Sequence, residues 1–389
     1  MFSQRLTWNL AVNRLNRALA EKQSNGAGIL DLTESNPTRA GFNYSETAWL
    51  PALANPRSRR YDPSPHGLPT ARAAVAAYYA ARSERVDPQN LFLTASTSEA
   101  YAYLFKLLAD PGDEILAPLP CYPLLDFLAA LESVQLQHYP LQYEAEKGWH
   151  IDFATLANVV TTRTAALVLV HPNNPTGSFV KPHEIAQLNA LCAEHALALI
   201  CDEVFLDYAS GDERHPPLSL VSNGEVLTFV VSGLSKIAGL PQMKLAWIHV
   251  NGPDEARVAA LERLEYVADT YLSVGTPVQW AAEELLAVRH ELQRQIRARL
   301  DTNYAFLLET CRRRQRGEVL LRQGGWYAVL GIPAEISEEE FAVNILVQEN
   351  VLVHPGYFYD FPRPGFLVLS LLTPIEIFQE GVVRIFARL

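Results

Sequence analysis

Short apolar runs alternate with helix-like segments between residues 91 and 250, and this alternation restricts the fold more than any other feature of the sequence. Two of the runs, Ala165 to Val170 and Ala196 to Ile200, contain no polar side chain, which is typical of strands buried on both faces. Strands that alternate with helices predict a parallel sheet covered by helices. We therefore expect an α/β fold with a large, doubly wound, mostly parallel sheet.

Polar side chains follow these predicted strands, at the points where the strands end. In chain order they are the hydroxyls of Ser96, Thr97 and Ser98, the ring of Tyr122, the amide of Asn174, the carboxylate of Asp202 and the amine of Lys236. Open parallel sheets bind ligands at the carboxyl ends of their strands. A single ligand could therefore contact all of these side chains.

Lys236 lies between two strand-like runs, Val226 to Val231 and Leu245 to Val250. Burial disfavours the charged ammonium and leaves a neutral amine that can act as a nucleophile. An ordinary lysine on a surface loop is the alternative interpretation of this stretch when it is taken alone.

The hydroxyl-rich stretch Ser96 to Ser98 stands directly before a helix predicted from Glu99 to about Leu108. Hydroxyls, free backbone N–H groups and the positive end of a helix dipole together suit a phosphate group. Simple capping of the helix by a serine or threonine is the alternative.

Three short motifs occur in a fixed order: Asn174-Pro175-Thr176-Gly177, Asp202 followed three residues later by Phe205, and Ser235-Lys236. With these motifs the chain resembles the class I/II aminotransferases, which are pyridoxal-phosphate enzymes of fold type I, similar to aspartate aminotransferase. The similarity runs from about Leu30 to the C-terminus. It implies a large cofactor-binding α/β domain at residues 46–276 and a small α+β domain built from residues 1–45 and 277–389.

The resemblance implies a role for each of these side chains. Lys236 would form the Schiff base with the cofactor aldehyde and later move a proton, and Asp202 would keep the pyridine nitrogen protonated. The other implied cofactor contacts are Asn174 at the phenolic oxygen, Tyr122 on the ring, and Ser96, Thr97, Ser98 and Ser235 at the phosphate. Tyr61 matches a tyrosine that in the family reaches the phosphate of the neighbouring subunit, which implies a homodimer with shared active sites.

Two cofactor positions depart from the family pattern. Lys244 stands where the family usually has an arginine. A positive charge still faces the phosphate, but the bidentate hydrogen bonding of a guanidinium is lost. Phe205 replaces a tyrosine whose hydroxyl would stabilise the anion of the cofactor's phenolic oxygen. We therefore expect the Schiff base to have a higher pKa than in relatives with the tyrosine.

A third departure concerns the substrate. Val368 occupies the place of the arginine that binds the substrate α-carboxylate in the family, and valine cannot pair with a carboxylate. Either another cation does so, with Arg363 and Arg39 as candidates, or the substrate has no carboxylate there. For Arg363 the alternative is a solvated loop residue. His354 lies in a segment that faces the active site in relatives, and a packed or capping histidine is the alternative there.

The resemblance predicts an enzyme that transfers an amino group between an amino acid and a 2-oxo acid, through the lysine Schiff base and pyridoxamine phosphate. A β-lyase or decarboxylase on the same fold is the nearest alternative, because the same lysine and cofactor serve those reactions. A cofactor-sensing domain of a transcription regulator and a phosphate-binding α/β protein without pyridoxal phosphate are the alternatives from other classes.

The net charge of −11 opposes a nucleic-acid or membrane-surface partner. The four cysteines show no paired metal-ligand spacing, and we expect no metal site. Arg5, Asn9 and Asn13 interrupt the N-terminal apolar residues, so we expect no signal peptide, and no apolar run has the length of a membrane span. These features predict a cytoplasmic protein that binds small molecules, and the resemblance at Tyr61 implies that it also binds a second copy of itself.

Overall fold

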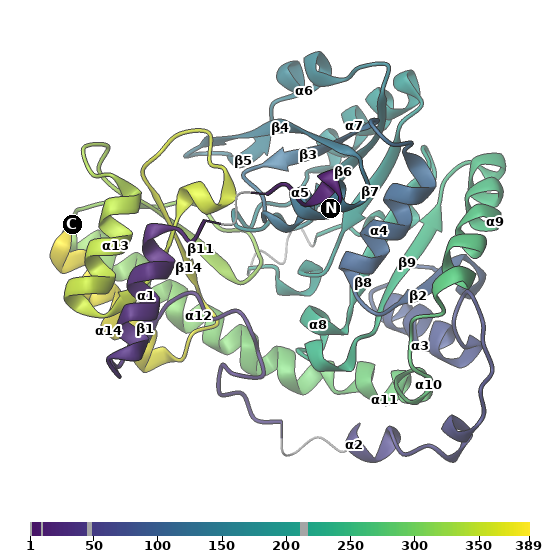
Figure 1. Ribbon diagram of the computed structural model, residues 1–389, viewed down its shortest axis with the longest axis horizontal. Coiled ribbons are helices and arrows are strands. Elements are labelled where there is room, and N and C mark those ends of the chain that lie inside the picture. Colours follow the sequence, from purple (N-terminus) through teal and green to yellow (C-terminus); the bar gives the residue numbers. More distant parts are fainter. Residues whose placement is uncertain (1, 9–10, 45–48, 211–216) are drawn as a thin grey trace.

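A large mixed sheet dominates the computed structural model, which describes residues 2–8, 11–44, 49–210 and 217–389 (Figure 1). Within these ranges the sheet has eight strands in the order β2-β9-β8-β7-β6-β3-β4-β5. Their bounds are β2 Leu91–Thr94, β3 Glu114–Leu119, β4 Gln135–Glu144, β5 Gly148–Ile151, β6 Thr164–Val170, β7 Ala198–Asp202, β8 Thr228–Gly233 and β9 Ala246–Asn251.

The middle of this sheet is parallel. Strands β8, β7, β6, β3 and β4 pair in parallel, whereas β9 and β5 run antiparallel to their neighbours. From β3 the chain proceeds outward to β4 and then returns to β6 on the other side of β3. Such a reversal of strand order is where doubly wound sheets bind their ligands. The predicted fold class is confirmed.

Helices cover both faces of the sheet because its strands are apolar on both faces. On β7, Leu199 and Cys201 point into one hydrophobic core, while Ala198 and Ile200 point into the other, as the two-residue period of a strand requires. The first core is covered by α3 (Pro69–Ala80), α6 (Phe153–Val159), α7 (Pro182–His195), α10 (Thr276–Trp280) and α11 (Ala282–Ala287). The second is covered by α4 (Thr97–Leu108), α5 (Leu124–Leu131) and α9 (Asp254–Tyr271).

A smaller antiparallel sheet lies beside the large one, on the left in Figure 1. Among the described residues its strand order is β10 (Glu318–Val319), β11 (Tyr327–Gly331), β14 (Phe366–Ser370) and β13 (His354–Pro355). A parallel pair, β1 (Leu30–Asp31) with β12 (Val351–Leu352), lies next to it. The surrounding helices are α1 (Arg14–Ser24), α12 (Arg289–Arg314), α13 (Glu338–Glu349) and α14 (Ile375–Arg388).

This smaller sheet has a third hydrophobic core, to which both ends of the chain contribute. Leu15 and Leu32 share it with Phe378 of α14. The core accords with a small α+β unit made from both termini, and the predicted boundaries near residues 46 and 276 stay predictions.

Two helix predictions differ from the structure. A helix over residues 5–22 is predicted by the roughly helical spacing of Leu6, Leu10, Leu15 and Leu19. The helix begins only at Arg14, because the side chain of Asn13 accepts the N–H of Asn16 at 2.7 Å and caps it there. Charges on one face and apolar residues on the other predict a single helix from Val278 to about Arg316. The structure divides this segment into α10, α11 and α12. Residues 9 and 10 lie outside the described part of the chain.

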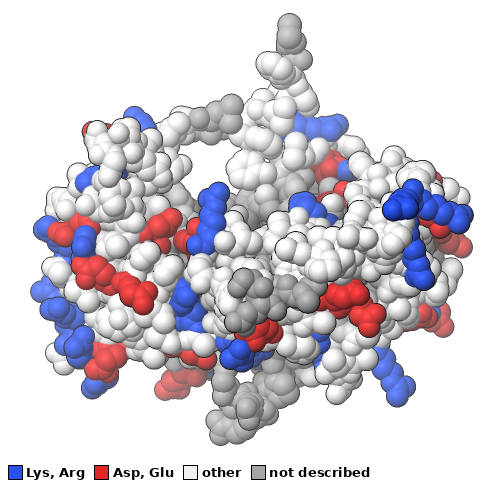
Figure 2. All heavy atoms as spheres, turned by 90° about the horizontal axis from the view of Figure 1, so that it is seen from below, with Lys and Arg blue, Asp and Glu red and all other residues white. Residues whose placement is uncertain are grey.

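Two further short helices, α2 (Trp49–Ala52) and α8 (Leu234–Ile237), complete the description. None of the helices in the described ranges is long and apolar enough to cross a membrane. Basic and acidic side chains are interspersed on the face drawn in Figure 2.

A buried carboxylate, Asp207, joins the two parts of the molecule. It accepts hydrogen bonds from the hydroxyl of Tyr78 on α3 (3.1 Å), from the amide of Gln293 on α12 (2.6 Å) and from the guanidinium of Arg82. The Gln293 amide also donates to the backbone oxygen of Ile237 in α8, at 2.8 Å. The position of α8 therefore depends on this network.

We predict that Asp207→Ala lowers the free energy of unfolding by about 3–5 kcal/mol, because it leaves a partly buried guanidinium and two other donors without their acceptor. The matched control is Asp254→Ala, which removes a carboxylate with a 90% exposed side chain that pairs with Arg257 and should cost less than about 1 kcal/mol. Denaturant unfolding of both variants measures the difference. Equal losses would contradict the role given to Asp207.

Candidate active site

The predicted ligand-binding side chains follow neighbouring strands of the large sheet. Asp202 is the last residue of β7 and pairs with Val170 at the end of β6 and with Val231 of β8. Asn174 follows β6, and Lys236 follows β8 as part of α8. The carboxyl ends of these parallel strands lie along one edge, so the sheet brings the three side chains to the same place.

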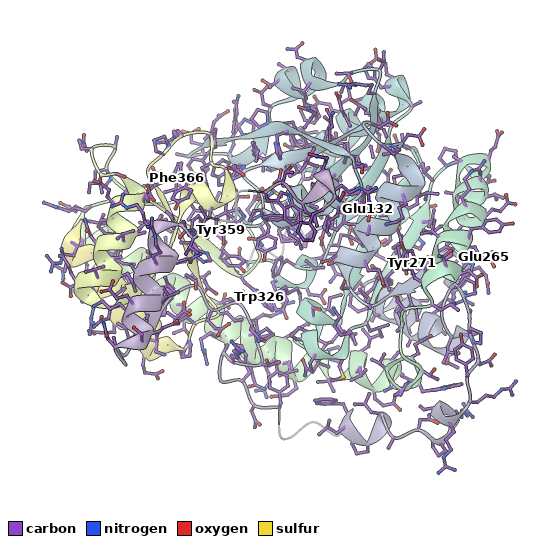
Figure 3. All side chains as sticks on the ribbon, in the orientation of Figure 1. Glu132, Glu265, Tyr271, Trp326, Tyr359 and Phe366 are labelled. Atoms are coloured by element: carbon purple, nitrogen blue, oxygen red, sulfur yellow. The ribbon has the colours of Figure 1, made fainter. Side chains whose placement is uncertain are left out.

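Lys236 is partly buried against aromatic rings. Its Nζ atom lies 4.8 Å from the ring centre of Trp326 and 5.5 Å from that of Phe205. Trp326 and Tyr359 lie between the two sheets, in the middle of the molecule (Figure 3). Burial lowers the pKa of the Lys236 amine to about 8, although the nearby charge of Asp202 acts in the opposite direction. A substantial fraction of the amine is therefore neutral near pH 8.

Asp202 is buried and carries a perturbed carboxyl group. Burial raises its pKa to about 6, while two hydrogen bonds and the charge of Lys236 lower it. One carboxylate oxygen accepts the backbone N–H of Val204 at 3.0 Å, and the other accepts the hydroxyl of Tyr101 at 3.1 Å. The carboxylate is thus fixed in orientation at both oxygens.

Two predicted cofactor contacts, Asn174 and Tyr122, have a group that the described residues do not fully cover. The side-chain oxygen of Asn174 is buried and has no hydrogen-bond partner among the described residues. Tyr122, which follows β3, keeps 47% of its surface exposed. A buried polar atom without a partner costs free energy, and a ligand that hydrogen-bonds the amide would remove this cost.

The predicted phosphate cup lies at the N-terminus of α4. The hydroxyl of Ser96 accepts the N–H of Glu99 at 3.2 Å, so this side chain caps the helix, as the alternative interpretation held. Thr97 and Ser98 form the first turn, whose backbone N–H groups have no partner within the helix, and both are partly exposed. Ser235 is also partly exposed.

The two unusual cofactor positions lie close to α8. The Phe205 ring is buried, 5.2 Å from the ring of Trp326 and 6.4 Å from that of Tyr327. Lys244 is exposed with a left-handed backbone, φ = 52°. Its neighbour Leu245 accepts the N–H of Leu234 at 2.9 Å, which places Lys244 beside the start of α8.

The two arginines considered for the substrate carboxylate lie on the surface. The Arg363 guanidinium is 4.7 Å from the ring centre of Phe366. Phe366 pairs with Gly331, whereas Tyr327 pairs with Ser370, so Arg363 lies at the opposite end of β11 from Trp326. Arg39 is exposed in a turn after Pro37. The structure therefore does not bring the Arg363 guanidinium to Lys236.

Tyr61 is 77% exposed, in the loop before α3. Its predicted contact is with a second copy of the chain, and because the structure describes one copy, this contact stays a prediction.

Val368 is buried in the core of the small sheet. Only 1% of its surface is exposed, and its cross-strand partners are Val329 and His354. Burial lowers the pKa of His354 to about 4, so this histidine is neutral at pH 7, and its Nδ1 atom lies 3.2 Å from the hydroxyl of Tyr359. Neither residue supplies a cation to a carboxylate.

Three contacts of this site were not predicted from the sequence. Tyr101 donates to Asp202, the hydroxyl of Tyr208 donates to the backbone oxygen of Lys236 at 2.7 Å, and Gln293 supports α8. Tyr101 follows Ser98 by three positions and so lies on the same face of a helix, which is a signal that the sequence did contain. The other two contacts join segments far apart in the chain and leave no local pattern.

A comparison of the sequence with those of known protein families identifies the family of this chain. The sequence profile described as aminotransferase class I and II matches residues 7–380. The chain belongs to the class I and II aminotransferases. It is therefore an enzyme that transfers amino groups, and the family prediction is confirmed.

Among its relatives, the alanine aminotransferase of Mycobacterium tuberculosis is 27% identical over 366 residues, covering 91% of this chain and 83% of that protein. The glutamate-pyruvate aminotransferase of Escherichia coli is 26% identical over 382 residues, covering 94% and 91%. The structure of an alanine aminotransferase from Pyrococcus furiosus superimposes with a TM-score of 0.89 at 24% identity, covering 100% of this chain and 99% of that one. This last similarity shows the shared fold.

We predict that Lys236→Met stabilises the cofactor-free protein at pH 7. An unfolded lysine titrates near 10.5, and the amine in the folded protein titrates near 8. Between these values the unfolded chain binds the extra proton, so stability rises with pH, and below about 8 the folded state bears the full cost of the buried charge. The variant lacks that cost, and its advantage should shrink as the pH rises from about 8 to 10.

Thermal unfolding across this pH range measures the effect. The matched control is Lys147→Met, which removes an exposed lysine paired with Glu144 at 2.7 Å and should show no such dependence on pH. A Lys236→Met protein that is less stable than the wild type at pH 7 would contradict the assigned burial.

Proposed function

We propose that this chain transfers an amino group between an amino acid and a 2-oxo acid with pyridoxal phosphate held by Lys236. The observation that carries the proposal is a partly buried amine, with its pKa lowered to about 8, near a buried carboxylate at the end of the adjacent strand. When bound, the cofactor supplies an aldehyde and an electron-accepting ring.

The residues present fit this cofactor. The side-chain oxygen of Asn174 is buried and accepts no hydrogen bond from the described residues, so the polar group has room for a ligand contact. The amide N–H of Asn174 would donate to the cofactor's phenolic oxygen. Asp202 would hold the proton on the ring nitrogen, and Tyr122, with its exposed ring, would cover one face. Ser96, Thr97, Ser98, Ser235 and Lys244 would hold the phosphate through N–H groups, hydroxyls and charge.

Lys236 would move the substrate proton, because an amine with a pKa near 8 can both accept and release a proton around neutral pH. The rings of Trp326 and Phe205 beside this amine exclude water from part of its surroundings. No finding favours the lyase or decarboxylase alternative.

The substrate is the open part of the proposal. The relatives named alanine and glutamate-pyruvate aminotransferases make alanine and 2-oxoglutarate the first pair to test. Arg363 and Arg39 remain the proposed cations for a carboxylate, and Arg363 would have to move to reach Lys236 from the far end of β11. We also propose a homodimer with shared active sites, to which Tyr61 contributes, and a cytoplasmic location.

The function is tested by adding single amino acids to the protein loaded with pyridoxal phosphate. We expect alanine to change the absorption of the bound cofactor and to release pyruvate, and subsequent 2-oxoglutarate to reverse the spectral change. Lys236→Ala should lose this activity by at least about a thousandfold, because it removes both the cofactor's attachment and the proton carrier. Release of ammonia or carbon dioxide while the absorption of the bound cofactor stays unchanged would contradict an aminotransferase.

We predict that Phe205→Tyr lowers the pH at which the absorption band of the bound cofactor changes, by about one pH unit or more. A hydroxyl at this position could donate to the phenolic oxygen and stabilise its anion, and a hydrogen bond to a charged group is worth about 1.5–3 kcal/mol. Spectral titration measures the shift. Phe361→Tyr, which adds a hydroxyl beside Trp149 and Phe366, should leave the titration unchanged. An unmoved titration in Phe205→Tyr would remove this explanation.

A further inference from the structure

The hydroxyl of Tyr101 is a donor to Asp202 that comes from a different element of the fold. Tyr101 belongs to α4, is buried, and places its hydroxyl 3.1 Å from one oxygen of the Asp202 carboxylate. The other oxygen accepts the N–H of Val204 at 3.0 Å. Tyr101 and Val204 therefore occupy one position on each oxygen, and a carboxylate has further lone pairs for a ligand.

The same helix also carries the proposed phosphate cup. Thr97 and Ser98 form the first turn of α4, and Tyr101 follows one turn later on the face that Ser98 occupies. The Tyr101 ring is held in the core of the sheet, 5.8 Å from the ring of Phe105. A single rigid helix thus fixes the spacing between the phosphate cup and the carboxylate.

The charges around the Asp202 carboxylate leave Tyr101 as a permanent donor. Burial and the charge of Asp202 raise the pKa of the Tyr101 phenol well above its ordinary value, so it keeps its proton. The other titratable groups that act on this carboxylate are the Lys236 amine and the thiols of Cys121 and Cys201. Burial raises the pKa of both thiols, so between pH 5 and 7 neither thiol changes its charge.

We propose that Tyr101 is a positioning residue for the aminotransferase reaction, which keeps the Asp202 carboxylate ionised and directed at the ring nitrogen of the cofactor. The inference rests on the proposed function. The hydroxyl does not touch the reacting atoms, and it acts through Asp202 alone. Removing the hydroxyl should make the ionised form of the Asp202 carboxylate less stable, while the ring of residue 101 still fills the same place in the core.

Tyr101→Phe tests this proposal. We expect the affinity for pyridoxal phosphate, followed by tryptophan fluorescence, to fall at low pH with a midpoint that lies about one pH unit higher than in the wild type, which is about tenfold in the protonation equilibrium. With alanine as donor, kcat should fall about tenfold while KM stays within about twofold, because the substrate contacts are intact.

Tyr139→Phe is the matched control. It also removes a buried phenol hydroxyl with one hydrogen bond, to the backbone oxygen of Val168 at 2.8 Å, and it should lower stability without moving the pH midpoint. In the Asp202→Asn background, adding Tyr101→Phe should have no further effect on kcat, because the carboxylate on which it acts is gone.

The outcomes separate this proposal from the proposed function. A wild-type protein that takes up no pyridoxal phosphate overturns both. A wild-type protein that binds it, together with a Tyr101→Phe variant whose pH midpoint and kcat equal those of the wild type, overturns the role of Tyr101 alone. Equal losses of kcat for Tyr101→Phe in the wild-type and Asp202→Asn backgrounds also overturn it.

Discussion

The site depends on placing an amine and a carboxylate together at a largely buried sheet edge. Burial opposes both charges, so it raises the pKa of Asp202 to about 6 and lowers that of Lys236 to about 8. Their mutual attraction acts against both shifts and keeps the pair from neutralising altogether. The outcome is an amine that can exchange a proton near neutral pH beside a carboxylate that is still ionised there. The proposed amino-group transfer requires the fold to hold Lys236 and Asp202 in this arrangement.

The large sheet supplies the burial, and the core of the small sheet helps to fix the position. Strands that are apolar on both faces keep water from the strand ends, where Asp202 lies. The short helix α8 has little structure of its own to hold Lys236. Its backbone oxygens accept hydrogen bonds from Tyr208 and Gln293, and Gln293 also binds Asp207. Because Gln293 belongs to α12, which also packs in the core of the small sheet, the placement of the amine depends on both cores.

Sequence patterns predicted the parts of the structure that are determined locally. The run Leu91 to Thr94 predicts a strand, and the segment Glu338 to Glu349 predicts a helix. Both elements have these bounds in the structure, because the first is a short apolar run and the second an amphipathic run with clear ends. Strand β4 was not predicted, since its exposed residues and Pro140 do not resemble a buried strand. The N-terminal helix was predicted too long because the cap at Asn13 was not recognised.

The candidate site shows the same division. Lys236 and Asp202 could be found because each stands at the end of an apolar run within a family motif. The bond between Tyr101 and Asp202 spans 101 residues of sequence, and that between Gln293 and Ile237 spans 56. Such contacts are created by the packing of helices against other elements. The position of Tyr101 one turn after Ser98 is visible in the sequence, but its bond to Asp202 is not, and Gln293 leaves no local pattern. Arg363 was also predicted from the sequence as a residue that could bind the substrate carboxylate. Nothing in the sequence indicated that its side chain packs on Phe366.

Chemical reduction of the protein with bound pyridoxal phosphate tests the central claim most directly. Borohydride would fix the cofactor to the side chain that holds it, and mass spectrometry of the peptides would locate the added mass. The account predicts a single modified residue, Lys236, and loss of the label in Lys236→Ala. Modification of other lysines with Lys236 left free would contradict the claim that the fold prepares this amine for the cofactor.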